Sequence, residues 1–236
     1  MTARSSTASP APLPPISGRF LMLVAVFVAC LVVSNFIAGK IVEFGVLNLS
    51  AALIVFPLTY IIGDVMTEVY GYRRARQVIW LGFLGNLVAV AAVMIAIALP
   101  AASFYEDHEA YVTILGQTPR ILAASLAAYL VGEFVNSYVM AKMKIWSRGR
   151  HLWTRTIGST VIGQSLDTTI FTVLAFAGVF PIEAIVAIVL TEWALKCLYE
   201  AAMTPATYAV VRWLKRAEAI DVYDRGTRFN PFALAE

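Results

Sequence analysis

Residues 56–76 read FPLTYIIGDVMTEVYGYRRAR, an apolar stretch that runs into two carboxylates and then into three arginines. Asp64 and Glu68 lie four residues apart, which places both side chains on one face of a helix. Ionisable groups are rare within membrane helices unless they face a cavity or a partner. The stretch therefore predicts a membrane helix that leads into a polar site. The alternative is a pair of acids in the headgroup zone beside Arg73 and Arg74.

The composition of the whole chain is that of a polytopic membrane protein. Of its 236 residues, 60% are hydrophobic and only 14% are charged. The mean hydropathy is +0.76, which lies outside the usual composition of a soluble domain. The sequence therefore predicts an all-α membrane bundle, embedded in the lipid bilayer.

Six charge-poor windows are long enough to cross a hydrocarbon core, which takes about 20 residues. The three cleanest hold 20, 20 and 29 uncharged residues, between Arg19 and Lys40, between Glu43 and Asp64, and between Arg76 and Glu106. The other three carry charges and cover residues 121–141, 156–180 and 182–211. Three spans on each side of the central loop allow a 3+3 inverted repeat.

The basic residues predict the orientation of these spans, because Lys and Arg accumulate in cytoplasmic loops. Fifteen of the 18 lie before the first span or after the second, fourth and sixth. The opposite side holds Lys40, Arg120 and the acidic residues of the loop 106–109. Both termini are therefore expected in the cytoplasm. The net charge of +3 follows from this topology and requires no nucleic-acid partner.

The chain divides into three expected parts. Residues 1–18, rich in Ser, Ala and Pro, predict a disordered cytoplasmic tail. Residues 19–216 form the six-helix transmembrane domain, and residues 217–236 a cytoplasmic C-terminal tail. No catalytic or phosphate-binding signature occurs, and the two histidines lie in loops on opposite predicted sides. We therefore expect no enzyme, no metal site and no cofactor.

Polar residues recur inside the later spans at helical spacing. The sets are Glu133 and Asn136; Gln164, Asp167 and Phe171; and Glu192, Lys196 and Glu200. Each set lies on one helix face. The acids outnumber the nearby bases Lys40 and Lys196, so some acids are expected to be neutral, exposed or paired with a ligand. The set on the last span has a second interpretation, a structural ladder that neutralises itself.

Other candidates carry weaker signals. Tyr60 and Phe171 can stack on a planar ligand, or belong to the core or to an interfacial belt. Lys40 can serve a site or extend to the outer surface. Small residues at helical spacing from Ala123 to Gly132 allow close helix contact within one chain or between two, which leaves a homodimer open.

Four segments of the chain resemble the queuosine precursor transporters, a family of vitamin uptake transporter-like membrane proteins. They read SNFIAGK (34–40), FPLTYIIGDVMTEVYGYRRAR (56–76), PRILAASLAAYLVGEFVNSYVMAKMK (119–144) and STVIGQSLDTTIFTVLAFAG (159–178). The second is the most specific. The pattern is met at Asn35, Lys40, Asp64, Glu68, Glu133, Asn136, Gln164 and Asp167.

The resemblance implies a six-helix protein of the bacterial inner membrane. It would import 7-deazaguanine bases, notably 7-cyano-7-deazaguanine, for the modified tRNA nucleoside queuosine. The residues suit a planar base, because carboxylates accept from its N–H groups and aromatic rings stack on its faces. Three interpretations remain open: a self-sufficient carrier, the substrate-binding membrane component of an ATP-energised uptake complex, and a general purine-base carrier.

Overall fold

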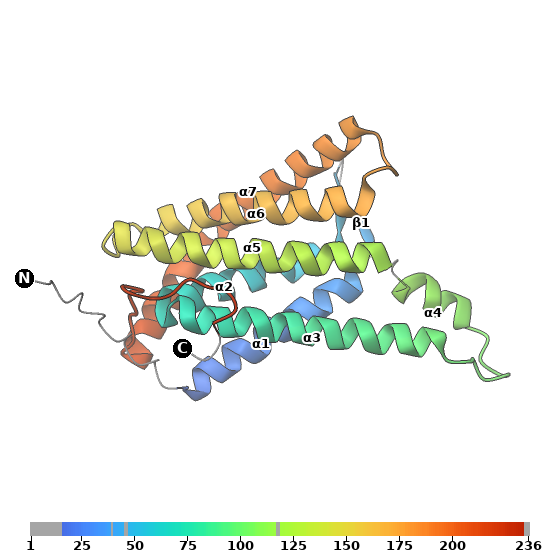
Figure 1. The fold of residues 1–236 in the computed structure, drawn as a ribbon, viewed down its shortest axis with the longest axis horizontal. Coiled ribbons are helices and arrows are strands. Elements are labelled where there is room, and N and C mark those ends of the chain that lie inside the picture. The colour runs from blue at the N-terminus through green and yellow to red at the C-terminus, as the bar shows by residue number, and fades with distance from the viewer. Residues whose placement is uncertain (1–15, 39, 45–46, 117–118, 234–236) are drawn as a thin grey trace, which may run out of the picture.

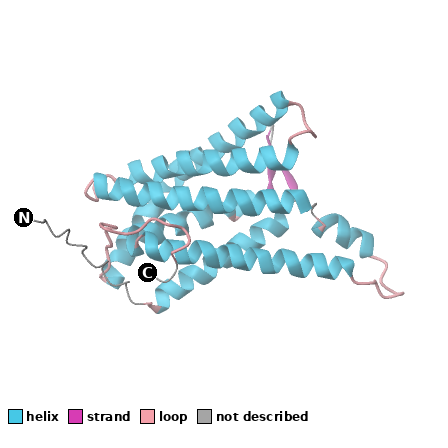
Figure 2. Ribbon diagram, in the orientation of Figure 1, coloured by secondary structure: helices cyan, strands magenta, loops and turns pink. Residues whose placement is uncertain are grey.

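The computed structural model describes residues 16–38, 40–44, 47–116 and 119–233 as a helical bundle with one small hairpin (Figures 1 and 2). The all-α fold class predicted from the sequence is confirmed. The helices are α1 (Gly18–Ile37), α2 (Phe56–Tyr70), α3 (Tyr72–Ala98), α4 (His108–Leu115), α5 (Pro119–Trp146), α6 (Leu152–Phe176) and α7 (Ile182–Glu218). The other elements are β1 (Ile41–Phe44), β2 (Leu47–Ser50) and the 3-10 turn η1 (Ala51–Ile54). The predicted N-terminal tail lies mostly outside the described residues.

The second charge-poor window differs from the helix expected there. Strands β1 and β2 form an antiparallel hairpin in which Ile41 pairs with Ser50, followed by η1 and only then by α2. The 15 residues of α2 span about 22 Å, less than a full membrane crossing needs. Apolar strands and apolar helices have the same hydropathy, so the charge count could not separate them. Pro57 in the first turn of α2 favours a helix start at that point.

Helix α2 lies at the centre of the bundle, in contact with α1, α3, α5 and α7. Its residues Val65, Met66 and Val69 are completely buried. Gly71 links α2 to α3 with a φ of 82°, a left-handed conformation that favours glycine. A side chain at Gly71 would also collide with Val222, whose Cγ1 lies 2.6 Å from the Cβ position. The C-terminal segment is therefore packed directly against the α2–α3 junction.

Different segments of the chain lie at the two ends of the bundle. One end holds the start of α1, the α2–α3 junction, the α5–α6 turn and the end of α7 (Figure 1). A salt bridge of 3.3 Å from Arg19 to Glu218 ties α1 to α7 there. The α3–α4 loop, α4 and the α6–α7 loop lie at the other end (Figure 1). The segments that carry most of the basic residues thus share one end of the molecule.

The described helices fit a multi-pass membrane protein. Three stretches are long and apolar enough to cross a bilayer: α1, α3 and residues 108–146, which contain α5. Helices α6 and α7 have 25 and 37 residues, sufficient in length, but carry more polar side chains. The number of six spans and the inverted repeat stay predictions.

The grouping of the basic segments at one end of the bundle predicts the outcome of site-directed labelling. Single cysteines replacing His108 and Arg150, in a background without Cys30 and Cys197, should react with an impermeant maleimide from opposite sides of the membrane. The basic end is expected on the inside, because Lys and Arg are retained there. Labelling of both positions from outside intact cells would contradict this topology.

Candidate functional site

Polar side chains from α2 and α5 meet inside the bundle. The Asn136 amide donates to Asp64 Oδ1 at 2.9 Å. The Glu133 carboxylate lies against the backbone of α2, with Oε2 3.4 Å from the position that a Cβ on Gly63 would take. Asp64, Glu133 and Asn136 are all buried. The structure therefore brings together three of the side chains that the sequence predicted for one site.

Two glycines allow α5 and α6 to approach closely at this level. A Cβ on Gly132 would lie 2.7 Å from the Cβ of Asp167, and one on Gly163 would lie 2.8 Å from the Cβ of Asn136. Both distances are shorter than van der Waals contact, so the close approach depends on glycine at these positions. Gln164 follows Gly163 and is buried. At Gly132, the small-residue pattern of α5 serves packing within one chain.

Several buried side chains on α2, α5, α6 and α7 leave polar atoms without a hydrogen-bond partner. Among the described residues these atoms include Tyr60 Oη, Asp64 Oδ2, Asn136 Oδ1, Gln164 Oε1, Thr172 Oγ1 and both carboxylate oxygens of Glu200. An unsatisfied buried polar atom costs about 1–3 kcal/mol, and it calls for an explanation. Most of these atoms are carboxylate or amide oxygens, which only accept. The acceptors on α2, α5 and α6 therefore form a site complementary to a ligand that donates several hydrogen bonds.

Asp167 and Phe171 lie beside this group on α6. The Lys196 ammonium donates to Asp167 Oδ2 at 2.8 Å and to Thr168 Oγ1 at 3.0 Å. The described contacts thus show Lys196 joining α7 to α6 instead of forming a ladder along α7 with its own neighbours. The Phe171 ring packs edge-on against Phe176, with the ring centroids 6.0 Å apart.

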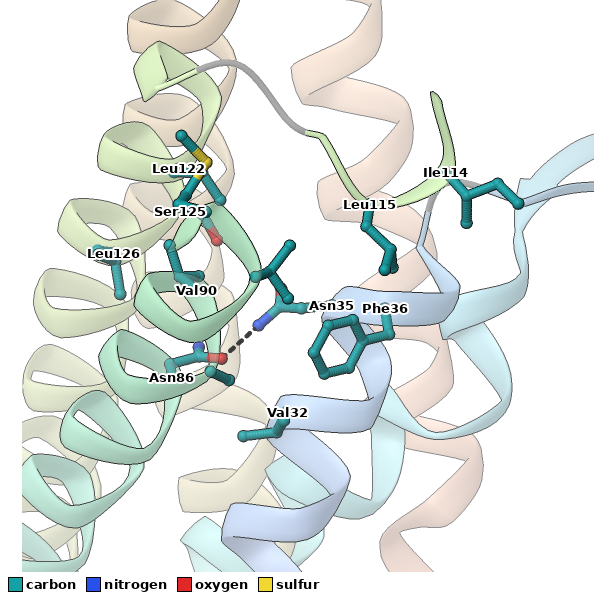
Figure 3. Close-up of a pocket in the computed structure, with 13 residues that line it drawn as sticks. Val32, Asn35, Phe36, Asn86, Val90, Ile114, Leu115, Leu122, Ser125 and Leu126 are labelled. Atoms are coloured by element: carbon teal, nitrogen blue, oxygen red, sulfur yellow. Dashed lines mark hydrogen bonds between the residues drawn. The ribbon is translucent and has the colours of Figure 1, made fainter. Parts of the chain in front are cut away.

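Asn35 and Lys40 lie apart from the polar group. The Asn35 amide donates to Asn86 Oδ1 at 2.7 Å, inside a mainly apolar pocket between α1, α3, α4 and α5 (Figure 3). Leu115 of α4 and Leu122 of α5 line the same pocket. Lys40 is exposed just before the hairpin.

Glu68 is paired with basic side chains, unlike Asp64 one turn earlier. Arg155 binds its carboxylate through two hydrogen bonds, of 2.8 Å to Oε2 and 2.7 Å to Oε1. Lys215 donates to Oε1 at 2.6 Å, and the Lys144 ammonium lies 3.7 Å from the same oxygen. We call these four residues the Glu68 ion cluster. It joins α2, α5, α6 and α7, and it leaves Glu68 little capacity to accept from a ligand.

The C-terminal segment closes this end of the bundle. The Asp221 carboxylate bridges Lys144 and Lys215 at 2.6 and 2.8 Å. Partial burial opposes its charged form, but hydrogen bonds from both lysines outweigh burial and hold the pKa of Asp221 below its ordinary value. Asp224 accepts from the Tyr72 backbone N–H at 3.0 and 3.1 Å, at the start of α3. Burial raises the pKa of Asp224 despite that contact.

Sequence reasoning missed the partners of Glu68 and the environment of Glu200. Arg155, Lys144 and Lys215 were counted as loop cations that set the topology, although all three reach a buried carboxylate. The excess of acids was the available signal, because a buried carboxylate needs compensation. It did not show which acids are compensated. A ladder of Glu200 with Lys196 and Glu192 was one of two interpretations of this set, and both oxygens of Glu200 are unpartnered.

The fold and the site together define a class of protein. In the described part of the chain no group of three His, Cys, Asp or Glu could hold a metal ion. A multi-pass helical membrane protein with buried hydrogen-bond acceptors at its centre has the architecture expected of a small-molecule transporter.

Comparison with known proteins identifies the family. The chain belongs to the family described as "Putative vitamin uptake transporter", whose model matches residues 50–210. It is 31% identical over 190 residues to a "Probable queuosine precursor transporter" of Bacillus subtilis, covering 79% of this chain and 82% of that protein. A protein of the same description from Haemophilus influenzae is 25% identical over 124 residues, 51% of this chain and 49% of its own. No solved structure matches the chain.

The Glu68 ion cluster predicts a large loss of stability when one partner is removed. Arg155→Gln should destabilise the protein by about 3–5 kcal/mol, because it leaves a buried carboxylate short of compensation. Thermal unfolding of the purified protein in detergent would measure the change. Arg150→Gln is the matched control, since Arg150 is exposed. Equal melting temperatures for the two variants would contradict the role given to the cluster.

Proposed function

We propose that this protein imports a queuosine precursor, a 7-deazaguanine base, across the inner membrane of a bacterium, with both termini in the cytoplasm. The family and the description of the two relatives support the substrate class. The observation that carries the proposal for the site is the set of buried, unpartnered acceptors on α2, α5 and α6, namely Asp64 Oδ2, Asn136 Oδ1 and Gln164 Oε1. The proposal assigns transport and no catalysis.

The proposed contacts follow from the chemistry of a guanine-like edge, which offers adjacent N–H donors. Asp64 Oδ2 and the Glu133 carboxylate can accept from such donors, and the free oxygens of Asn136 and Gln164 add further acceptors. The Tyr60 ring, buried one turn before Asp64, is suited to stack on the base. Asp167 borders this group through the contact of its Cβ with Gly132.

The remaining candidates of the sequence have more peripheral roles in this proposal. Glu68 stabilises the closed end through its ion cluster. Asn35 lies in the pocket shown in Figure 3, which is lined by α1, α3, α4 and α5 and is separate from the proposed site. The homodimer stays a prediction, because the close contact at Gly132 is made within one chain.

A second candidate function is the substrate-binding component of a complex driven by a separate ATPase. The family description as a vitamin uptake transporter favours it, since some vitamin-uptake systems work in that way. The two functions differ in one measurement. A carrier reconstituted alone in liposomes exchanges substrate across the membrane, whereas an isolated binding component does not.

Import can be tested by the queuosine content of tRNA. The host cells lack synthesis of 7-deazaguanine bases, still complete queuosine, and receive a limiting external supply of 7-cyano-7-deazaguanine. Asp64→Asn and Glu133→Gln should each reduce incorporation, because losing a charged hydrogen bond costs about 1.5–3 kcal/mol, roughly tenfold to a hundredfold in affinity.

The matched control is Glu183→Gln, which removes an exposed acid at the start of α7. Membrane abundance of all variants is measured by immunoblot. Unchanged queuosine content after deletion of the gene would count against import. Equal competition by plain guanine would favour a general purine-base carrier.

A further inference from the structure

Glu200 is a buried acid that the contacts described so far do not explain. It lies on α7 with 1% of its surface exposed, and neither carboxylate oxygen has a hydrogen-bond partner. No other side chain in the described ranges has two oxygens in this condition. Its own backbone carbonyl accepts from Thr204 Oγ1 at 2.9 Å, which leaves the carboxylate uncompensated.

The groups around Glu200 supply negative charge and no free cation. Helix α7 packs against α2 and α6. From α2, the buried carboxyl group of Asp64 interacts electrostatically with Glu200, as it does with Glu133 of α5. Tyr60 of α2 also senses the charge of Glu200. The further charged or titratable groups facing this region are Asp167 on α6 and Glu192, Lys196 and Cys197 on α7.

The basic side chains nearest to Glu200 are engaged elsewhere. Lys196, one turn earlier on α7, donates to Asp167 and Thr168 of α6. The three cations at the closed end of the bundle belong to the Glu68 ion cluster. Asp64 is held by the Asn136 amide through one oxygen, while its other oxygen is unpartnered. Two buried carboxyl groups with unpartnered oxygens thus lie on the contacting helices α2 and α7.

Two carboxyl groups at close range cannot both ionise in a low-dielectric setting, so such a pair binds a proton. Intramembrane acids in this situation mark proton pathways in transporters. Protonation converts one carboxylate into a hydroxyl donor, which the unpartnered oxygen of the other can accept. When the pair holds one proton, its two carboxyl groups can therefore hydrogen-bond to each other.

We propose that Glu200, paired with Asp64, is the binding site of a coupling proton, and that this protein is a proton symporter. The inference rests on the proposed import function. A neutral base and one proton enter together from the outer side, and both are released into the cytoplasm. Symport is the mode that uses an inward proton gradient for import.

The local structure of α7 fits a site that changes its access. Pro205 lies inside α7, five residues after Glu200. Proline removes the backbone donor that would bind the carbonyl four residues earlier, here that of Ala201. The missing hydrogen bond makes α7 easier to bend close to Glu200. Bending there would alter the distance between Glu200 and Asp64, and with it the affinity of the pair for a proton.

The test uses the purified full chain in liposomes with radiolabelled 7-cyano-7-deazaguanine. One assay measures exchange of labelled for unlabelled base at equal pH on both sides. The other measures accumulation when the outside is one pH unit more acidic and the membrane potential is clamped. For one proton per base, a gradient of one unit supports about tenfold accumulation. The wild-type protein should show both activities.

Glu200→Gln should retain exchange and lose gradient-driven accumulation, with the internal concentration rising no higher than the external one. A ligand-binding residue would lose both. Glu183→Gln, which removes an exposed acid in the first turn of α7, is the matched control and should retain both. Accumulation by Glu200→Gln equal to that of the wild type would overturn the inference.

A measurement on the wild-type protein alone keeps the proposal testable if the variant does not fold. Adding the base to liposomes in weakly buffered medium should make the outside more alkaline, as a pH-sensitive dye would report. Exchange of the base without a rise in external pH, or without accumulation along the pH gradient, would refute proton coupling and leave the proposed import intact. Absence of exchange by the wild type would instead contradict the self-sufficient carrier, and the symport inference with it.

Discussion

The compensation of one buried carboxylate holds the described bundle together at one end. Glu68 is fully buried on the central helix α2, and a charge in that position is costly unless it is paired and hydrogen-bonded. Arg155, Lys144 and Lys215 supply that pairing from three other helices. Asp221 then neutralises part of the added positive charge. The positions of α5, α6, α7 and the C-terminal segment all depend on this arrangement.

The two acids of α2 consequently differ in chemical role, although they lie one turn apart. The carboxylate of Glu68 is saturated by cations, whereas Asp64 is held only by an amide and leaves one oxygen unpartnered. The difference arises from what surrounds each turn: Arg155, Lys144 and Lys215 reach Glu68, whereas the described hydrogen bond to Asp64 comes from the neutral amide of Asn136. A rigid, charge-balanced end thus adjoins an unbalanced centre that can bind a ligand.

Much of the fold follows from the sequence, because the long apolar helices and the grouping of basic residues depend on composition along the chain. The β1–β2 hairpin and the short α2 could not be predicted in this way, because an apolar strand and an apolar helix have the same hydropathy. For the site, helical spacing correctly placed Asn136 and Glu133 on one face of α5. It could not show that Arg155 reaches Glu68 from another helix, because such contacts join segments distant in sequence.

The same limit applies to Glu200, for which the sequence left a structural ladder and a polar site both open. Along α7, Glu200 and Lys196 have the spacing of a stabilising pair. In space, Lys196 forms a salt bridge of 2.8 Å with Asp167 of α6, and both carboxylate oxygens of Glu200 are left without a hydrogen-bond partner. A local pattern is overridden wherever a neighbouring helix supplies a better partner. The acid that loses its partner in this competition is the one free to bind a proton, so the packing of α6 against α7 itself determines which carboxyl group can couple transport to a gradient.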